Sequence, residues 1–224
     1  PILVKTVPSF TDLMSGNAQL NNVSEVEIGD LLGRDMVPPI DELISASVES
    51  KAVLVTGAGG TIGSEICRKI VKLKPKRLVL YDNSEFALYA VEKQLRSLGI
   101  EGELVFLLGS IMHKSHLDSV IREFQIETIY HAAAFKHVPM VESNIIEGVR
   151  NNVVGTWNVV DSAARHNVEE LVLISSDKAV RPTNVMGATK RLAELIVQAY
   201  ASNFPGLKYS MVRFGNVLRS SGSV

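Results

Sequence analysis

Short apolar runs rich in branched residues alternate with stretches of helical periodicity from residue 51 onward. The runs predict buried β-strands at KAVLVT (51–56), RLVLY (77–81), ELVFLL (103–108), ETIYHA (127–132), ELVLIS (170–175) and YSMVRF (209–214). Apolar residues between them recur at helical spacing, as at Ile62, Ile66 and Ile70. Strands that are apolar throughout and separated by helices imply a parallel sheet covered on both faces. Residues 51–224 are therefore predicted to form a doubly wound α/β domain, with six strands in the order 3-2-1-4-5-6.

Residues 1–50 lack this alternation. Prolines interrupt the segment, acidic residues accumulate toward its end, and its apolar runs are short. This composition predicts a linker or N-terminal extension with one short helix near residues 40–47. The chain begins at Pro1 and stops at Val224, just after the sixth predicted strand. We therefore interpret it as a fragment of a longer protein.

Composition narrows the function classes. The 224 residues are 46% hydrophobic and 21% charged, with a net charge of −1, as expected of a globular domain. This balance argues against a general nucleic-acid or membrane-surface binder, which usually carries excess basic residues. No apolar run reaches the ~20 residues that a membrane-spanning helix needs. A single cysteine, Cys67, excludes a disulfide framework and fits a reducing compartment.

A glycine-rich turn, VTGAGGTIGSE, links the first predicted strand to the first predicted helix. Gly57, Gly60 and Gly63 form a TGxxGxxG pattern, and Gly59 adds a further glycine. Glycines let the backbone turn tightly and approach a pyrophosphate, which then binds the free N–H groups of the helix N-terminus. In this strand–turn–helix context the motif predicts a dinucleotide site, and a purely structural turn is the alternative.

The second predicted strand ends in an acidic residue at the spacing of a ribose ligand. Asp82 lies 19 residues after Gly63, close to the ~20 expected. A carboxylate there accepts hydrogen bonds from both ribose hydroxyls and repels a 2′-phosphate. No arginine follows it directly, so NAD is favoured over NADP. The alternative for Asp82, and equally for Asn83 or Ser84, is a helix N-cap.

The ends of the third and fourth predicted strands also carry candidates. Ser110 stands where many dinucleotide-binding relatives of this fold place an Asp next to the adenine, and its hydroxyl could still bond the base. Small residues at 132–134 let the backbone pass close to a flat cofactor, and Lys136 and His137 then project toward the cleft. The histidines lack a matching cysteine or carboxylate cluster, so no metal site is predicted.

The stretch with the most candidate catalytic residues is LISSDKAVRPTNVMGATK (173–190), which begins in the fifth predicted strand. Asp177 and Lys178 are adjacent, so one can give and the other take a proton. Met186 and Lys190 are four residues apart and share a helix face. Ser175, one residue before Ser176 in an alternating strand, is predicted to face away and pack.

These motifs together resemble the extended short-chain dehydrogenase/reductase superfamily over roughly residues 51–224. Three of them, AAFKHVPMVE, SSDKAVRPTNVMGATKRLAE and VRFGNVLRSSGSV, resemble its polysaccharide-biosynthesis branch, the nucleotide-sugar 4,6-dehydratases acting on UDP-N-acetylglucosamine. The resemblance implies a Rossmann-type fold with NAD as cofactor. It also implies cofactor contacts from Gly57, Gly59, Gly60, Thr61, Ile62, Gly63, Asp82, Ser110, Ile111, Ala132, Ala133, Ala134, Lys136, Asn152 and Lys190.

The resemblance also assigns catalytic roles. Ser176 bonds the C4 oxygen of the sugar, Asp177 is the acid toward O6, and Lys178 is the base at C5. Lys190 donates to the nicotinamide ribose. Met186 occupies the usual tyrosine position, as it often does in the long members of the branch. The O4 proton then goes to Asp177, which we favour, to Lys190, or to a water chain. Lys136, His137 and Asn216 are the expected substrate contacts.

The resemblance sets expectations for the whole protein as well. It implies a UDP-sugar substrate, no nucleic acid, and a homodimer or higher homo-oligomer through helices over 143–166 and 187–203. EVEIGDLLGRDMVPP resembles the linker of long, membrane-anchored members, whose catalytic domain faces the cytoplasm at the inner membrane. The C-terminal substrate lobe is expected to be absent from this fragment, which by itself is expected to be soluble. The alternatives are a nucleotide-sugar 4-epimerase and an inactive NAD-binding scaffold, for which Met186 is the best support.

Overall fold

The computed structural model describes residues 5–6, 14–15, 24–25, 40–98 and 102–217. The chain divides into two compact units, residues 1–41 and 42–224. In the first unit, β1 (Lys5–Thr6) pairs antiparallel with β2 (Ser24–Glu25). Most of the predicted extension over residues 1–50 lies outside the described residues, and its boundary remains a prediction.

The second unit is built on a parallel sheet. Its strands are β3 (Ala52–Thr56), β4 (Arg77–Asp82), β5 (Glu103–Leu108), β6 (Thr128–His131), β7 (Glu170–Ile174) and β8 (Lys208–Val212). They lie in the order β5-β4-β3-β6-β7-β8, which confirms the predicted order 3-2-1-4-5-6. The direction of winding reverses between β3 and β6, which is where such sheets bind ligands.

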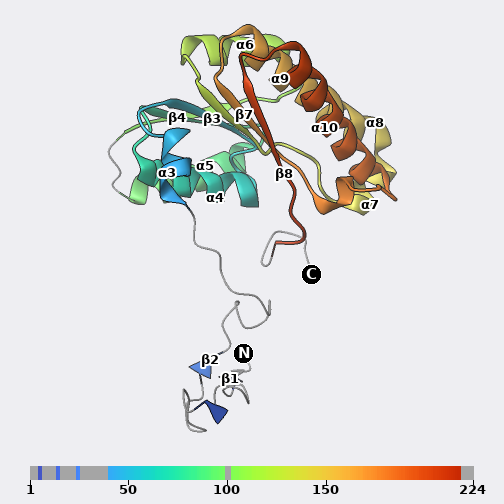
Figure 1. Cartoon of the computed structure of the whole chain (residues 1–224), viewed down its shortest axis with the longest axis horizontal. Helices are drawn as coiled ribbons and strands as arrows, with labels where there is room; N and C mark the ends of the chain where they lie inside the picture. The colour runs from blue at the N-terminus through green and yellow to red at the C-terminus, as the bar shows by residue number, and fades with distance from the viewer. Residues whose placement is uncertain (1–4, 7–13, 16–23, 26–39, 99–101, 218–224) are drawn as a thin grey trace. The chain divides into compact units, whose positions relative to one another are not determined.

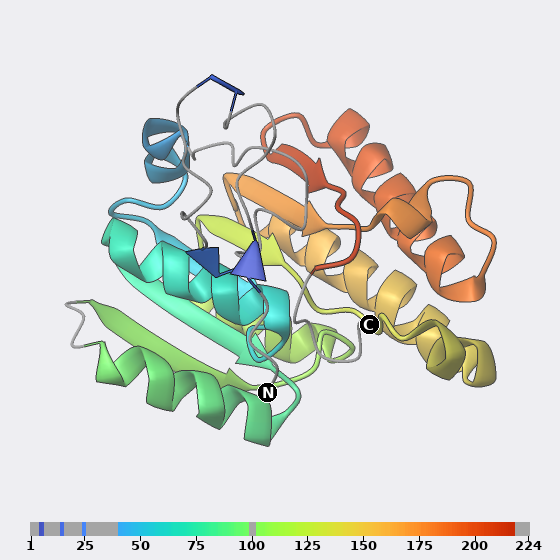
Figure 2. The ribbon, with the colours of Figure 1, turned by 90° about the horizontal axis from the view of Figure 1, so that it is seen from below.

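Helices cover both faces of this sheet (Figures 1 and 2). The longer ones are α4 (Thr61–Ile70), α5 (Glu85–Ser97), α6 (Lys114–Glu123), α9 (Gly155–Arg165) and α10 (Val185–Asn203). The shorter ones are α3 (Asp41–Ala46), α7 (Val138–Ser143), α8 (Ile145–Val149), the 3₁₀ turns η1 (Val71–Leu73) and η3 (Asp177–Ala179), and the π-helical turn η2 (Arg150–Val154). The predicted short helix near residues 40–47 corresponds to α3.

Two buried clusters show why the sequence folds in three layers. Alternate residues of one strand face opposite sides, so Val53 packs with α4 and α5 while Leu54 packs with α6, α9 and α10. Cys67 lies in the cluster that contains Val53, and burial there raises the pKa of its thiol to about 12. Both faces of the central strands are therefore covered by apolar side chains, as the continuous apolar runs predicted.

The residues after α3 join the amino-terminal edge of the sheet. The Ser47 hydroxyl donates to Glu170 at 2.6 Å, and the Ser47 carbonyl accepts from Thr128 at 2.8 Å. Val48 is fully buried in the cluster under α4 and α5. Residues 42–50 therefore belong to the same compact unit as the sheet. Within the described ranges, no helix combines the length and apolarity needed to cross a membrane.

Candidate functional site

Every predicted site residue follows the carboxyl end of a strand or lies on a helix that packs against one. Because the strands are parallel, these ends share one edge of the sheet. The glycine loop follows β3, Asp82 closes β4, and the 132–137 segment follows β6. The Ser176–Lys178 segment follows β7, and Asn216 follows β8. The topology therefore brings the predicted cofactor and catalytic residues to a common edge.

The glycine loop is packed too closely for side chains. Gly57 has a φ of +69°, and a Cβ there would lie 2.6 Å from the Ala133 backbone. A Cβ on Gly63 would overlap the carbonyl oxygen of Gly57. Gly60 is the N-cap of α4, whose first turn contains Thr61 and Ile62. The first N–H groups of this helix have no partner inside the helix, so the loop fits a pyrophosphate.

Asp82 is buried at the end of β4 and holds the glycine loop in place. One carboxylate oxygen accepts from the Gly59 N–H at 2.8 Å, and the other accepts from the Ser84 N–H at 2.9 Å. Ser84, and not Asp82, is the N-cap of α5. A carboxylate offers about four acceptor sites, so Asp82 can still accept from ribose hydroxyls.

The segment after β5 has its own internal bonds. The Ser110 hydroxyl accepts from the Met112 N–H at 3.2 Å, and its hydrogen remains available to a base. Ile111 is buried in the core, where its carbonyl accepts from Asn158 at 2.9 Å. Ile111 therefore anchors the turn that presents Ser110.

Asn152 holds the segment after β6 in place through hydrogen bonds to its backbone. It lies in the π-helical turn, is 1% exposed, and bonds both the N–H and the carbonyl of Phe135, at 2.8 and 2.9 Å. It also donates to Thr189 of α10 at 3.0 Å. These bonds fix the path of residues 132–135 beside the glycine loop, while Lys136 and His137 beyond them are exposed.

His131 is part of the scaffold. Its ring is buried between the hydroxyls of Thr56 at 2.7 Å and Thr156 at 3.0 Å. Burial, with a smaller effect of Lys190, lowers its pKa to about 3, so the imidazole is neutral. Within the described part of the chain, no group of three or more His, Cys, Asp or Glu residues could hold a metal ion.

Ser176, Asp177, Lys178 and Asn216 form a connected polar group where β7 and β8 end. Ser176 donates to Asp177 at 2.9 Å, and the Lys178 amine contacts Asp177 at 3.3 Å and Asn216 at 3.0 Å. The Asp177 N–H donates to the Phe214 carbonyl at 3.1 Å, which joins the two segments. Asp177 loses some solvent, which raises its pKa, but bonds from Ser176 and Lys178 outweigh this and lower it.

Met186 and Lys190 lie one turn apart on α10 and are both buried, which confirms their shared face. The Lys190 amine donates to the Ile174 carbonyl at 2.7 Å. Its burial lowers its pKa to about 8, and the charge of Glu194 opposes that shift. A Cβ on Gly187 would overlap the Lys178 carbonyl oxygen, so glycine lets α10 approach η3 this closely.

Sequence reasoning missed Glu194. This carboxylate is fully buried, and it accepts from Ser175 at 2.7 Å, from Arg213 at 2.7 and 2.6 Å, and from Arg191 at 2.9 Å. Ser175 is 4% exposed, which confirms that it faces away from the site. One signal was available, because Glu194 continues the buried face of α10 at the spacing of Met186 and Lys190.

Comparison with known proteins decides the family. The family model described as "Polysaccharide biosynthesis protein" matches residues 53–224. The chain belongs to this family. The match confirms the family resemblance of the motifs. The matched residues cover all six strands of the parallel sheet, apart from Ala52 at the start of β3, together with the residues at its carboxyl-terminal edge.

Relatives within and around this family are similar over most of the chain. It is 45% identical over 219 residues to the capsular polysaccharide biosynthesis protein CapD of Staphylococcus aureus, covering 97% of this chain and 37% of that protein. It is 32% identical to a UDP-N-acetylglucosamine 4,6-dehydratase (inverting) of Campylobacter jejuni, covering 78% and 51%. A UDP-glucose 4-epimerase of Rickettsia typhi is 31% identical, with the same two coverages.

A solved structure supports the fold of the family. The X-ray structure of Pen from Bacillus thuringiensis matches with a TM-score of 0.73 and 34% identity, covering 79% of this chain and 53% of that one. The chain thus spans about half of the Campylobacter, Rickettsia and Bacillus thuringiensis proteins, and less than half of the Staphylococcus protein. This part of the family holds a Rossmann-type domain.

Proposed function

We propose that this chain is the NAD-binding part of a nucleotide-sugar 4,6-dehydratase that acts on UDP-N-acetylglucosamine in polysaccharide or glycan synthesis. The observation that carries the proposal is the polar group of Ser176, Asp177, Lys178 and Asn216, which lies at the ligand-binding edge. An elimination across C5 and C6 needs a base and an acid side by side, and Lys178 and Asp177 supply them. The similarity to a named 4,6-dehydratase supports the same substrate class.

The residues divide the proton transfers among them. A nicotinamide dinucleotide in the glycine-loop site would supply hydride acceptance at C4 and hydride return at C6. Ser176 holds O4, Lys178 removes the C5 proton, and Asp177 protonates the departing O6. Met186 cannot exchange a proton, so the O4 proton passes to Asp177 in this scheme, with Lys190 or a water chain as the alternatives. Lys136 and His137 bind the sugar nucleotide together with Asn216.

Product analysis of the full-length protein in heavy water tests the proposal. With UDP-N-acetylglucosamine we expect a UDP-4-keto-6-deoxy sugar carrying deuterium at C5, because the base at C5 exchanges its proton with solvent. The configuration at C5 also reports inversion or retention. A 4-epimer without deuterium at C5 would instead identify an epimerase, the activity named for the Rickettsia relative. Absence of any product would favour the inactive scaffold.

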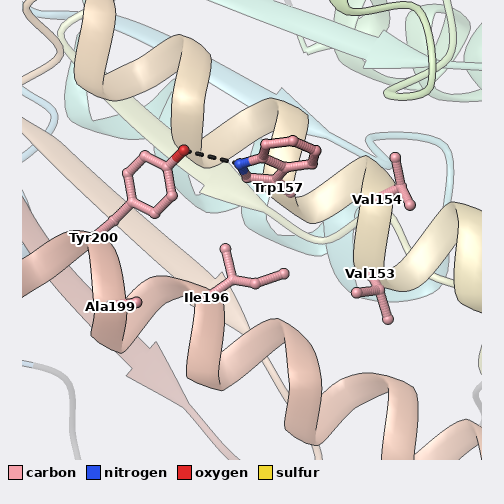
Figure 3. Close-up of a pocket in the computed structure, with 6 residues that line it drawn as sticks. All are labelled: Val153, Val154, Trp157, Ile196, Ala199 and Tyr200. Atoms are coloured by element: carbon pink, nitrogen blue, oxygen red, sulfur yellow. Dashed lines mark hydrogen bonds between the residues drawn. The ribbon is translucent and has the colours of Figure 1, made fainter.

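An apolar groove is lined by residues of η2, α9 and α10, the region expected to form a dimer. It is lined by Val153, Val154, Trp157, Ile196, Ala199 and Tyr200 (Figure 3). The Trp157 indole donates to the Tyr200 hydroxyl at 2.8 Å, which holds the apolar ring at the surface, where it is 52% exposed. These are the helices expected to form a dimer, so we propose a homodimer or higher homo-oligomer through them.

Replacing Ile196 with Asp is expected to dissociate the dimer, because a carboxylate buried in an apolar interface without a partner costs several kcal/mol. Analytical ultracentrifugation should show the molecular mass falling to that of the monomer. Tyr89→Asp is the matched control, since Tyr89 is 64% exposed on α5, far from this groove in the sheet order. A dissociated Tyr89→Asp variant, or an intact Ile196→Asp dimer, would contradict the proposed interface.

The full-length protein is proposed to be anchored in the inner membrane, with this domain on the cytoplasmic face. Support comes from the likeness of residues 25–39 to the linker of long members. The small share of the Staphylococcus protein that this chain covers leaves room there for further segments. Cytoplasmic nucleotide sugars would then reach the site directly.

A further inference from the structure

Glu194 is the buried hub of a side-chain cluster that joins three elements. We define the Glu194 cluster as Glu194, Arg191, Ser175 and Arg213. Glu194 and Arg191 belong to α10, Ser175 directly follows β7, and Arg213 directly follows β8. Glu194 has no exposed surface, and four hydrogen bonds of 2.6–2.9 Å occupy its two oxygens. The bonds from Arg213, with those from Ser175 and Arg191, lower its pKa to about 2 against the effect of burial, so it is a permanent anion.

The strand ends that this cluster joins are those that carry the proposed chemistry. Ser175 is adjacent to Ser176, and its N–H donates to the Val212 carbonyl at 2.7 Å. Arg213 begins the segment that leads to Asn216, the partner of Lys178. A shift of either strand end relative to α10 would therefore move the base and acid relative to the sugar. Misplacement by about 1 Å can cost 10²-fold in rate.

The charge of Glu194 also acts on the Lys190 amine and raises its pKa. Lys190 lies one helical turn before Glu194, and carboxylates at this spacing stabilise an ammonium group. Burial of Lys190 outweighs the charge of Glu194 and lowers the pKa of Lys190 to about 8, while Arg191 and Arg213 pair with the same carboxylate. Besides the cluster, ionisable groups on the elements around Lys190 and α10 include His131 of β6, which is neutral, Glu142 of α7, Asp161 of α9, and Asp177 and Lys178 of η3.

We propose that Glu194 is a positioning residue, which fixes the two strand ends that carry the proposed chemistry relative to α10 and whose charge acts on the buried Lys190 one helical turn away. The proposal rests on the dehydratase function proposed above, but it concerns a residue outside the acid–base pair. Glu194 acts through Ser175 and Arg213 on position, and through its charge on Lys190. Neither effect requires Glu194 to touch the sugar or the cofactor.

Two substitutions in full-length protein test the charge effect in opposite directions. The readout is the pH dependence of NAD affinity, measured by titration calorimetry from about pH 6 to 10. The family resemblance implies that charged Lys190 donates to the nicotinamide ribose, so the affinity for NAD should fall as pH rises through the Lys190 pKa of about 8. Glu194→Gln removes an anion and should move this midpoint down by about one pH unit, whereas Arg213→Gln should move it up.

Glu170→Gln is the matched control. Glu170 is also largely buried and also bonds a serine and a basic residue, Ser47 and Lys208, but at the opposite edge of the sheet. It should leave the midpoint and kcat unchanged, while Glu194→Gln should lower kcat by about 10- to 100-fold. General loosening of the fold would move the midpoints of the two cluster variants in the same direction.

Each remaining outcome decides the inference. Midpoints that move together, or no further than in Glu170→Gln, overturn it, as does a wild-type affinity that does not change with pH. If Glu194→Gln fails to fold, an upward shift in Arg213→Gln supports the inference and its absence overturns it. If the wild-type protein makes no 4-keto sugar, the dehydratase proposal fails by itself, and the NAD midpoints still decide the role of Glu194.

Discussion

Asp177→Asn is expected to lower kcat of the full-length dehydratase by about 10²–10⁴-fold, the usual contribution of a general acid–base group. The amide keeps the size of the side chain but cannot carry a proton between O4 and O6. Asp177 is 57% exposed, so the fold and the affinity for NAD should stay close to wild type. Steady-state assays of 4-keto sugar formation, with calorimetric NAD titration, measure both effects.

Glu169→Gln provides the comparison for Asp177→Asn. Glu169 is 56% exposed and pairs with Lys51 at 2.8 Å, but at the amino-terminal edge of the sheet. Its loss should leave kcat unchanged, since it lies at the edge opposite the proposed site. Wild-type kcat in Asp177→Asn would remove this residue from the mechanism and leave Lys190 or a water chain to accept the O4 proton.

Gly63→Ala is expected to weaken NAD binding by at least about tenfold and to lower the free energy of unfolding by about 1–3 kcal/mol, the usual cost of overpacking. The added Cβ would overlap the Gly57 carbonyl oxygen, so the loop or α4 must shift. That shift moves the N–H groups that are proposed to hold the pyrophosphate. Chemical denaturation and NAD titration separate the loss of stability from the loss of binding.

Alanine substitutions at two other glycines are expected to have smaller effects on NAD binding than Gly63→Ala. A Cβ on Gly60 would lie 3.3 Å from the Gly57 oxygen, a tight contact that a small shift relieves, so Gly60→Ala should have a milder effect. A Cβ on Gly206 meets nothing within 4 Å, so Gly206→Ala should bind NAD like the wild type. Equal affinities in Gly63→Ala and Gly206→Ala would show that the loop does not hold the cofactor.

The fold was predictable because its strands carry unusually plain signals. Buried parallel strands are apolar on both faces, so runs such as ELVLIS stand out from the helices around them, and each predicted strand matches an observed one within about two residues. The glycine loop and Asp82 were predictable for the same reason, since their chemistry depends on residue type and spacing along one short segment.

The supporting contacts were not predictable, because they join residues distant in sequence. Asn152 was expected to contact the cofactor, but its bonds to Phe135, which the π-helical turn makes possible, could not be inferred from its position in the sequence. Glu194 and Arg213 meet only after α10 has packed beside β8. Asp82 also has a structural role that its spacing did not indicate, since it accepts a hydrogen bond from the Gly59 N–H and so stabilises the glycine loop.

The attachment of residues 42–50 has a mechanical consequence. Ser47 is bonded to Thr128 and Glu170, which stand at the starts of β6 and β7. A pulling force applied at Ser47 would thus act on the amino-terminal ends of β6 and β7, at the edge of the sheet opposite the proposed site.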